Sequence, residues 1–167
     1  LKKNNLIEIY PQRGITIAHI DIKLVEEMAF LRSVLEKAIV EELCGCITYE
    51  GLTELEKIIQ LQEFYEKNKD THKLYELDNE FHKAMFALCN KERLYSLMEA
   101  AQVHFNRLRT LSLYSVKEHK IVNEHWAIFD AIKERNKLEA VDLIAAHLSR
   151  YKIDKNEIME AYPEYFK

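Results

Sequence analysis

Apolar residues recur along most of the chain at intervals of three and four residues, the spacing of an amphipathic helix. Asp21 and Thr48 precede the first two of these patterns and are suitable N-caps. Asp70 or Thr71 is placed to begin the third, and Asn90 the fourth. The patterns predict helices over residues 21–43, 48–66, 70–88, 90–113, 116–135 and 138–151, with one more short helix in the tail, 155–167.

The first residues follow a different pattern. Residues 6–9 and 15–17 are short apolar runs rich in β-branched side chains, and the turn-forming sequence Tyr-Pro-Gln-Arg-Gly lies between them. This order predicts a β-hairpin. A lone hairpin is only marginally stable in water, so we expect it to belong to a separate domain.

These elements together predict the fold class. Only 3 glycines and 2 prolines occur among 167 residues, which favours long helices over a turn-rich β architecture. The links between the helices are short, so consecutive helices should run antiparallel. We therefore predict an all-α antiparallel bundle of six to seven helices over residues 20–167, preceded by a short β-hairpin in residues 1–19.

Charge and cysteine content narrow the class of protein. The net charge of -4 argues against a chain that itself grips DNA, because phosphate binding requires a basic surface. No apolar run approaches the roughly 20 residues of a membrane span. The odd number of cysteines, 3, indicates reduced thiols in the cytoplasm. Two of them form Cys44-Gly45-Cys46, where Gly45 is placed to end the first helix.

Four residues form a candidate metal site. Asp78 and His82 are four apart on one predicted helix, so their side chains leave the same face. His125 and His147 lie mid-helix among apolar neighbours on two later helices. A lone histidine in such a place is usually packed in the core. Spacing alone leaves the metal site and the packed core open as alternatives.

The cost of burial favours the metal. One unpaired carboxylate and three imidazoles would be expensive to bury unless they share a partner. A divalent ion supplies that partner, and three nitrogens with one carboxylate suit zinc or nickel better than calcium or magnesium.

Three arginines are candidates for binding an anion. Arg32 precedes Glu36 by four residues, a spacing that is also typical of a surface ion pair. Arg107 and Arg109 point about 200° apart on their helix, so at most one should face the interior. An interior guanidinium is suited to a carboxylate ligand.

The sequence offers no positive sign of catalysis. Nucleophile elbow, P-loop and dinucleotide-binding motifs are absent. A metal-dependent hydrolase with a histidine-rich site is the alternative function, and it would need a general base beside the ion. Glu80 and Glu124 are near the candidate ligands in sequence but should point away from them. We therefore predict that the chain is not an enzyme.

The order of these residues resembles a known family. Asp78-Asn79-Glu80-Phe81-His82, followed by Glu124-His125 and His147-Leu148, is similar to the C-terminal FadR domain, the FCD domain, of GntR-type transcription regulators. Leu31-Arg32 with Leu35-Glu36 resembles the first sensing helix of that domain. The hairpin resembles the wing at the end of a winged-helix DNA-binding domain.

The resemblance carries further expectations. It implies a helical bundle around a central cavity, with a zinc or nickel ion held by Asp78, His82, His125 and His147. It implies that the effector is a small organic carboxylate, for which Arg32, Arg107 and Arg109 are candidate contacts. It also implies a homodimer that binds operator DNA through winged-helix domains, with Arg13 at the hairpin turn placed to approach DNA. Because no recognition helix is seen, we expect this chain alone to bind DNA weakly and without sequence preference.

Overall fold

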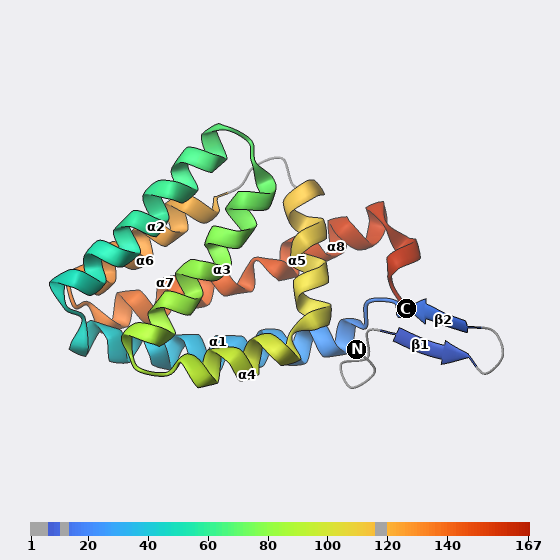
Figure 1. The fold of residues 1–167 in the computed structure, drawn as a ribbon, viewed down its shortest axis with the longest axis horizontal. Helices are drawn as coiled ribbons and strands as arrows, with labels where there is room; N and C mark the ends of the chain where they lie inside the picture. The colour runs from blue at the N-terminus through green and yellow to red at the C-terminus, as the bar shows by residue number, and fades with distance from the viewer. Residues whose placement is uncertain (1–6, 11–13, 116–119) are drawn as a thin grey trace.

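A computed structural model describes residues 7–10, 14–115 and 120–167 (Figure 1). It confirms the predicted all-α fold preceded by a β-hairpin. Among the described residues there are eight α-helices rather than six or seven. They are α1 (Ile22–Cys46), α2 (Tyr49–Lys67), α3 (Thr71–Leu88), α4 (Glu92–Ala101), α5 (Val103–Ser115), α6 (Ile121–Lys133), α7 (Lys137–Ser149) and α8 (Tyr151–Ala161), followed by the 3-10 turn η2 (Pro163–Tyr165).

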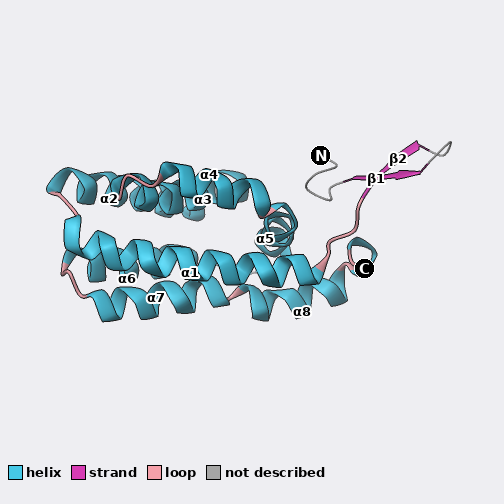
Figure 2. Ribbon diagram, turned by 90° about the horizontal axis from the view of Figure 1, so that it is seen from below, coloured by secondary structure: helices cyan, strands magenta, loops and turns pink. Residues whose placement is uncertain are grey.

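The hairpin forms as predicted. Strand β1 (Ile7–Tyr10) pairs antiparallel with β2 (Gly14–Ile17), and both lie outside the helical bundle (Figure 2). The paired residues are Ile7 and Ile17, Glu8 and Thr16, Ile9 and Ile15, and Tyr10 and Gly14. Gly14 has a φ of 104°, a conformation that favours glycine. Arg13, the predicted DNA contact, lies outside the described residues.

Three predicted helix starts are confirmed by their hydrogen bonds. The side chains of Asp21, Thr48 and Asp70 accept bonds from backbone N–H groups in the first turns of α1, α2 and α3. Two predicted boundaries are wrong. α1 does not end at Gly45 but continues through Cys46. Asn90 caps no helix start; it adopts a φ of 57° just after α3, a left-handed conformation that asparagine tolerates well.

The predicted helix over residues 90–113 is two helices, separated at Gln102. Tyr95 and Met98 of α4 pack into the larger core cluster, whereas Phe105 and Leu108 of α5 pack into a second cluster with α1 and α8. Figure 1 shows α4 running along α1, whereas α5 runs at a steep angle to it. No glycine or proline marks this break, so tertiary packing explains it.

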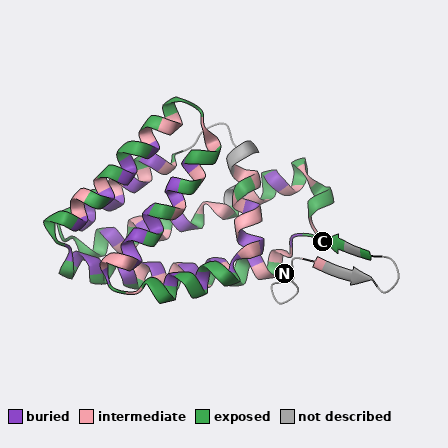
Figure 3. Ribbon diagram, viewed as in Figure 1, coloured by how far each residue is buried: buried purple, intermediate pink, exposed green. Residues whose placement is uncertain are grey.

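The bundle has two layers of helices, and buried polar groups lie between them. Figure 2 shows α2, α3 and α4 on one side and α1, α7 and α8 on the other. Buried positions follow the inward faces of the helices (Figure 3). Among the residues whose burial is described, eight buried ones are polar or charged: Arg32, Glu36, Gln62, Asp78, His82, Gln102, His104 and His125. Within the described ranges, no helix is both long and apolar enough to cross a membrane.

Candidate metal centre

Helix α3 presents Asp78 and His82 to the interior. The helix is amphipathic, and its buried face carries large apolar side chains such as Phe81 and Met85. Burial of these apolar groups fixes which side of α3 faces inward. Asp78 and His82 share that side, with 3 % and 0 % of their surfaces exposed. Asp78 and His82 thus lie together in the core, as their spacing predicted.

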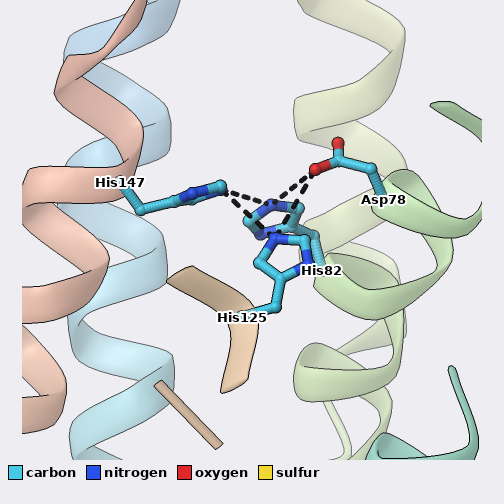
Figure 4. A group of neighbouring side chains, drawn as sticks. All are labelled: Asp78, His82, His125 and His147. Atoms are coloured by element: carbon cyan, nitrogen blue, oxygen red, sulfur yellow. Dashed lines mark hydrogen bonds and ion pairs between the residues drawn. The ribbon is translucent and has the colours of Figure 1, made fainter. Parts of the chain in front are cut away.

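His125 of α6 and His147 of α7 meet these two residues from the opposite side (Figure 4). The Nε2 atom of His147 lies 3.2 Å from that of His82 and 3.4 Å from that of His125. The Oδ1 atom of Asp78 lies 3.5 Å from Nε2 of His125 and 3.9 Å from Nε2 of His82. One ligand atom from each of the four residues lies within 4.8 Å of all the others.

Each imidazole is held through its other nitrogen by an acceptor on a different helix. Nδ1 of His82 lies 2.5 Å from a carboxylate oxygen of Glu36. Nδ1 of His147 lies 2.8 Å from a carboxylate oxygen of Glu124. Because an ionised carboxylate only accepts hydrogen bonds, Nδ1 carries the proton in both rings. The lone pair of Nε2 therefore points into the cluster.

The third imidazole is oriented by an amide. Nδ1 of His125 lies 2.7 Å from Oε1 of Gln62. The Nε2 group of Gln62 donates to the Leu77 carbonyl oxygen at 2.9 Å, which fixes the amide with its oxygen toward the histidine. Nδ1 of His125 is thus the donor, and its Nε2 lone pair also faces the cluster. Phe81 stacks on this imidazole, with 4.1 Å between the ring centroids.

Burial keeps these histidines neutral. It lowers the pKa of His82, lowers that of His125 well below the usual 6.5, and lowers that of His147 to about 4. A neutral imidazole with a free lone pair is the form that binds a metal ion. Because the single proton of each neutral ring is on Nδ1, the adjacent Nε2 atoms cannot hydrogen-bond to one another.

The cluster fits a divalent ion. Zinc bonds to nitrogen and carboxylate oxygen are about 2.0–2.2 Å long, which places neighbouring ligand atoms roughly 3.0–3.5 Å apart. The separations of 3.2, 3.4 and 3.5 Å among the Nε2 and Oδ1 atoms match that range, and the 3.9 Å between Oδ1 of Asp78 and Nε2 of His82 lies slightly beyond it. Three lone pairs and one carboxylate oxygen directed at one buried point would repel each other unless they share a cation.

The three candidate arginines have different surroundings. Arg32 is buried and donates from Nε to Glu36 at 2.5 Å, so the alternative of a surface ion pair is wrong. Arg109 bonds the second carboxylate oxygen of Asp78 and donates to Oδ1 of Asn79 at 2.9 Å. Arg107 does not join the cluster, because its guanidinium donates to the Ala18 carbonyl oxygen at 2.6 Å.

The charges around the cluster are coupled. Burial alone would raise the pKa of Glu36, but the Arg32 guanidinium and His82 outweigh it and hold this pKa below its ordinary value. Burial and the positive charge of Arg32 lower the pKa of Arg109. Glu36 is therefore ionised, and the two guanidinium groups lie close enough to affect each other.

Sequence reasoning missed the residues that orient the histidines. Gln62 and Glu124 were not recognised as partners of His125 and His147, and Glu36 was considered only as a partner of Arg32. Glu124 was expected to point away from the ligands, but it accepts from Nδ1 of His147 and also from Arg150 at 3.1 Å. These contacts join residues on separate helices, and no local spacing signals them.

The decisive comparison is with families of known proteins. The model of the FCD domain matches residues 27–150, which include α3, α6, α7 and all four cluster residues. The chain belongs to the FCD domain family. This confirms the predicted resemblance.

Relatives of this FCD domain are transcription regulators. It is 24 % identical to the HTH-type transcriptional repressor RspR of Escherichia coli over 167 residues, covering 99 % of this chain and 73 % of RspR. It is 28 % identical to the HTH-type regulator YdhC of Bacillus subtilis over 156 residues, covering 89 % of this chain and 67 % of YdhC.

Solved structures agree in fold. E. coli McbR/YncC matches with a TM-score of 0.81 at 15 % identity, over 97 % of this chain and 81 % of that one. A GntR regulator from Rhodococcus sp. RHA1 matches with a TM-score of 0.68 at 20 % identity, over 97 % and 76 %.

These findings fix the class of function. The chain is an FCD domain, and its relatives are HTH-type transcription regulators, which are not enzymes, in agreement with the prediction. The alternative of a metal-dependent hydrolase is not supported.

Proposed function

We propose that this domain binds one zinc or nickel ion through Asp78, His82, His125 and His147. The supporting observation is that all three imidazoles are held at Nδ1 by acceptors, so that their Nε2 lone pairs converge beside one carboxylate oxygen. If the imidazoles only packed the core, nothing would require their three Nε2 lone pairs to converge on one point. Four ligands leave an octahedral ion further positions for oxygen atoms of a small molecule.

The effector is a small organic carboxylate. A divalent ion, Arg32 and Arg109 outweigh the negative charges of Asp78 and Glu36, so the site has a net positive charge and suits an anion. The guanidinium groups offer the paired donors that a carboxylate accepts. Arg32 is our first choice as its contact and Arg109 the second, and a hydroxy acid such as citrate or lactate belongs to the expected class.

Binding of this acid regulates transcription. We infer that residues 1–19 form the end of a winged-helix DNA-binding domain and that residues 20–167 sense the effector. A homodimer in the cytoplasm would place two such DNA-binding domains on an operator, with Arg13 at the hairpin turn near the DNA. The effector changes their relative placement by binding one arrangement better than the other.

A thermal-shift screen of small organic acids tests the proposal. A ligand that binds only the folded state stabilises it, so the right acid at about a hundred times its dissociation constant should raise Tm by roughly 5–10 °C. The primary amide of the same acid is the matched control, because it keeps the shape and removes the charge. The rise should vanish with chelator. If amides or cations stabilise the zinc-loaded protein while no acid does, the carboxylate sensor is refuted.

A further inference from the structure

Helix α5 has two functional faces. At about 100° per residue, Phe105 and Arg109 lie on one side of this helix, and His104 and Arg107 lie on the other. The contacts of these four residues agree with that division. One face touches the metal centre, and the opposite face touches the segment that joins the hairpin to α1, residues 18–21.

The first face is anchored on the residues of the site. Arg109 bonds Asp78 and Asn79 of α3, and its guanidinium lies 5.1 Å from the ring centroid of Tyr75. The guanidinium of Arg32 lies 5.7 Å from the ring centroid of Phe105. Asp78 thus directs Oδ1 toward the histidines and Oδ2 toward α5.

The second face is anchored on residues 18–21. Arg107 donates to the Ala18 carbonyl oxygen at 2.6 Å, and the Asp21 N–H donates to Nδ1 of His104 at 3.1 Å. The C-terminal end of the chain holds the same segment, because the Ile20 N–H donates to the Tyr165 carbonyl oxygen at 2.7 Å. Ala18 and Ile20 are buried, so this segment is packed into the domain.

We propose that α5 couples the occupancy of the metal centre to residues 18–21, and that Arg107 is the residue that transmits this coupling. The inference rests on the proposed metal function. An ion bound through Oδ1 restrains the Asp78 carboxylate, and the carboxylate restrains Arg109 through Oδ2. Since a helix moves as a rigid element, α5 then restrains residues 18–21 through Arg107 and His104. The end of the hairpin precedes this segment directly, so it is placed to receive the signal.

Amide hydrogen exchange followed by NMR tests the coupling in the complete chain, with Zn²⁺ and after chelation. The reporter is the Asp21 amide, which donates to α5. The reference is the Asn68 amide at the end of α2, which donates to the Phe64 carbonyl oxygen at 3.1 Å. Under conditions in which both amides exchange through global unfolding, stabilisation of the whole fold slows them equally. Coupling should slow Asp21 by roughly fivefold or more beyond Asn68.

Two matched arginine variants identify the path. Arg107→Gln removes the bond to Ala18 but leaves the Asp21 bond to His104 in place, so it should reduce the excess slowing at Asp21 without abolishing it. Arg135→Gln is the control, because the Arg135 guanidinium also donates to main-chain carbonyls, those of Cys44, Gly45 and Ile47. It should keep the excess slowing at Asp21.

The outcomes separate this coupling from the metal function. If Zn²⁺ binds stoichiometrically but slows both amides of the wild type equally, the coupling is refuted and the metal function stands. The wild-type comparison needs no variant, so misfolding of Arg107→Gln does not affect it. If Zn²⁺ does not bind at all, the metal function fails and the coupling fails with it.

Discussion

A carboxylate oxygen of Glu36 lies 2.5 Å from Nδ1 of His82, and neither side chain is exposed to solvent. The pair joins α1 to α3 and sets the imidazole in one orientation and one tautomer. The same relationship recurs between Glu124 and His147, and between Gln62 and His125. Acceptors behind metal-binding imidazoles tune affinity in this way in many metalloproteins. The polar centre of the bundle is therefore organised around the Nε2 atoms.

Loss of one histidine should empty the site. His82→Ala removes one of the three nitrogen ligands, and we expect the purified variant to retain much less than one ion per chain after dialysis. His72→Ala is the matched control, because His72 lies on the same helix with 70 % of its side chain exposed. Elemental analysis by mass spectrometry measures both. Equal zinc content in His82→Ala and His72→Ala would rule out the ligand set.

The amide behind His125 should control affinity without touching the ion. Gln62→Leu removes the acceptor for Nδ1, so the ring loses its preferred tautomer, and the dissociation constant for Zn²⁺ should rise by about 10–100-fold. Competition with a chromophoric chelator measures it. Glu63→Gln is the control, since Glu63 is the next residue and accepts from Trp126 instead, at 2.9 Å. An unchanged constant in Gln62→Leu would mean that packing alone orients His125.

Local pattern was enough to predict most of the helices. Their starts at Asp21, Thr48 and Asp70 depend on side chains that cap their own helices, and such caps are readable from sequence. The break at Gln102 was not predicted because α4 and α5 bury their apolar residues against different clusters. Only the assembled bundle shows that difference.

The candidate site, like the fold, could be predicted from the sequence only in part. Asp78 and His82 were predicted from spacing on one helix. His125 and His147 were grouped with them because burying the four polar groups requires a shared partner, and the family resemblance then supported the same set. Gln62 lies 63 positions before His125 in the chain. A contact of that separation depends on how helices pack, so the acceptors behind the histidines could not be found from sequence pattern.

Acid should destabilise the metal-free domain. Burial lowers the pKa of His147 from 6.5 to about 4, so the unfolded chain binds a proton more readily than the folded one between these values. The free energy of unfolding should therefore be highest above pH 6.5 and fall as the pH drops toward 4, by about 3 kcal/mol from this residue. His82 and His125, whose pKa values are also lowered by burial, act in the same direction.

Urea denaturation at several pH values, with chelator present, measures this loss. The metal-free His147→Gln variant should lose less stability between pH 6.5 and 4 than the wild type, because it lacks one of the titrating rings. His72→Ala should keep the wild-type slope. A stability that rises on acidification over this range would contradict the burial of neutral imidazoles.

Arg32 should contribute far more to stability than an exposed arginine does. Arg32→Gln leaves Glu36 buried with His82 as its remaining partner, and breaking a buried ion pair costs about 3–5 kcal/mol. Because His82 still donates to Glu36, we expect a loss near 3 kcal/mol in the free energy of unfolding, measured in urea with chelator. Arg93→Gln, at an exposed position on α4, should cost less than about 0.5 kcal/mol. If both variants lose equally little, Arg32 and Glu36 behave as a solvent-screened surface pair, and the charged interior on which an anion site depends is absent.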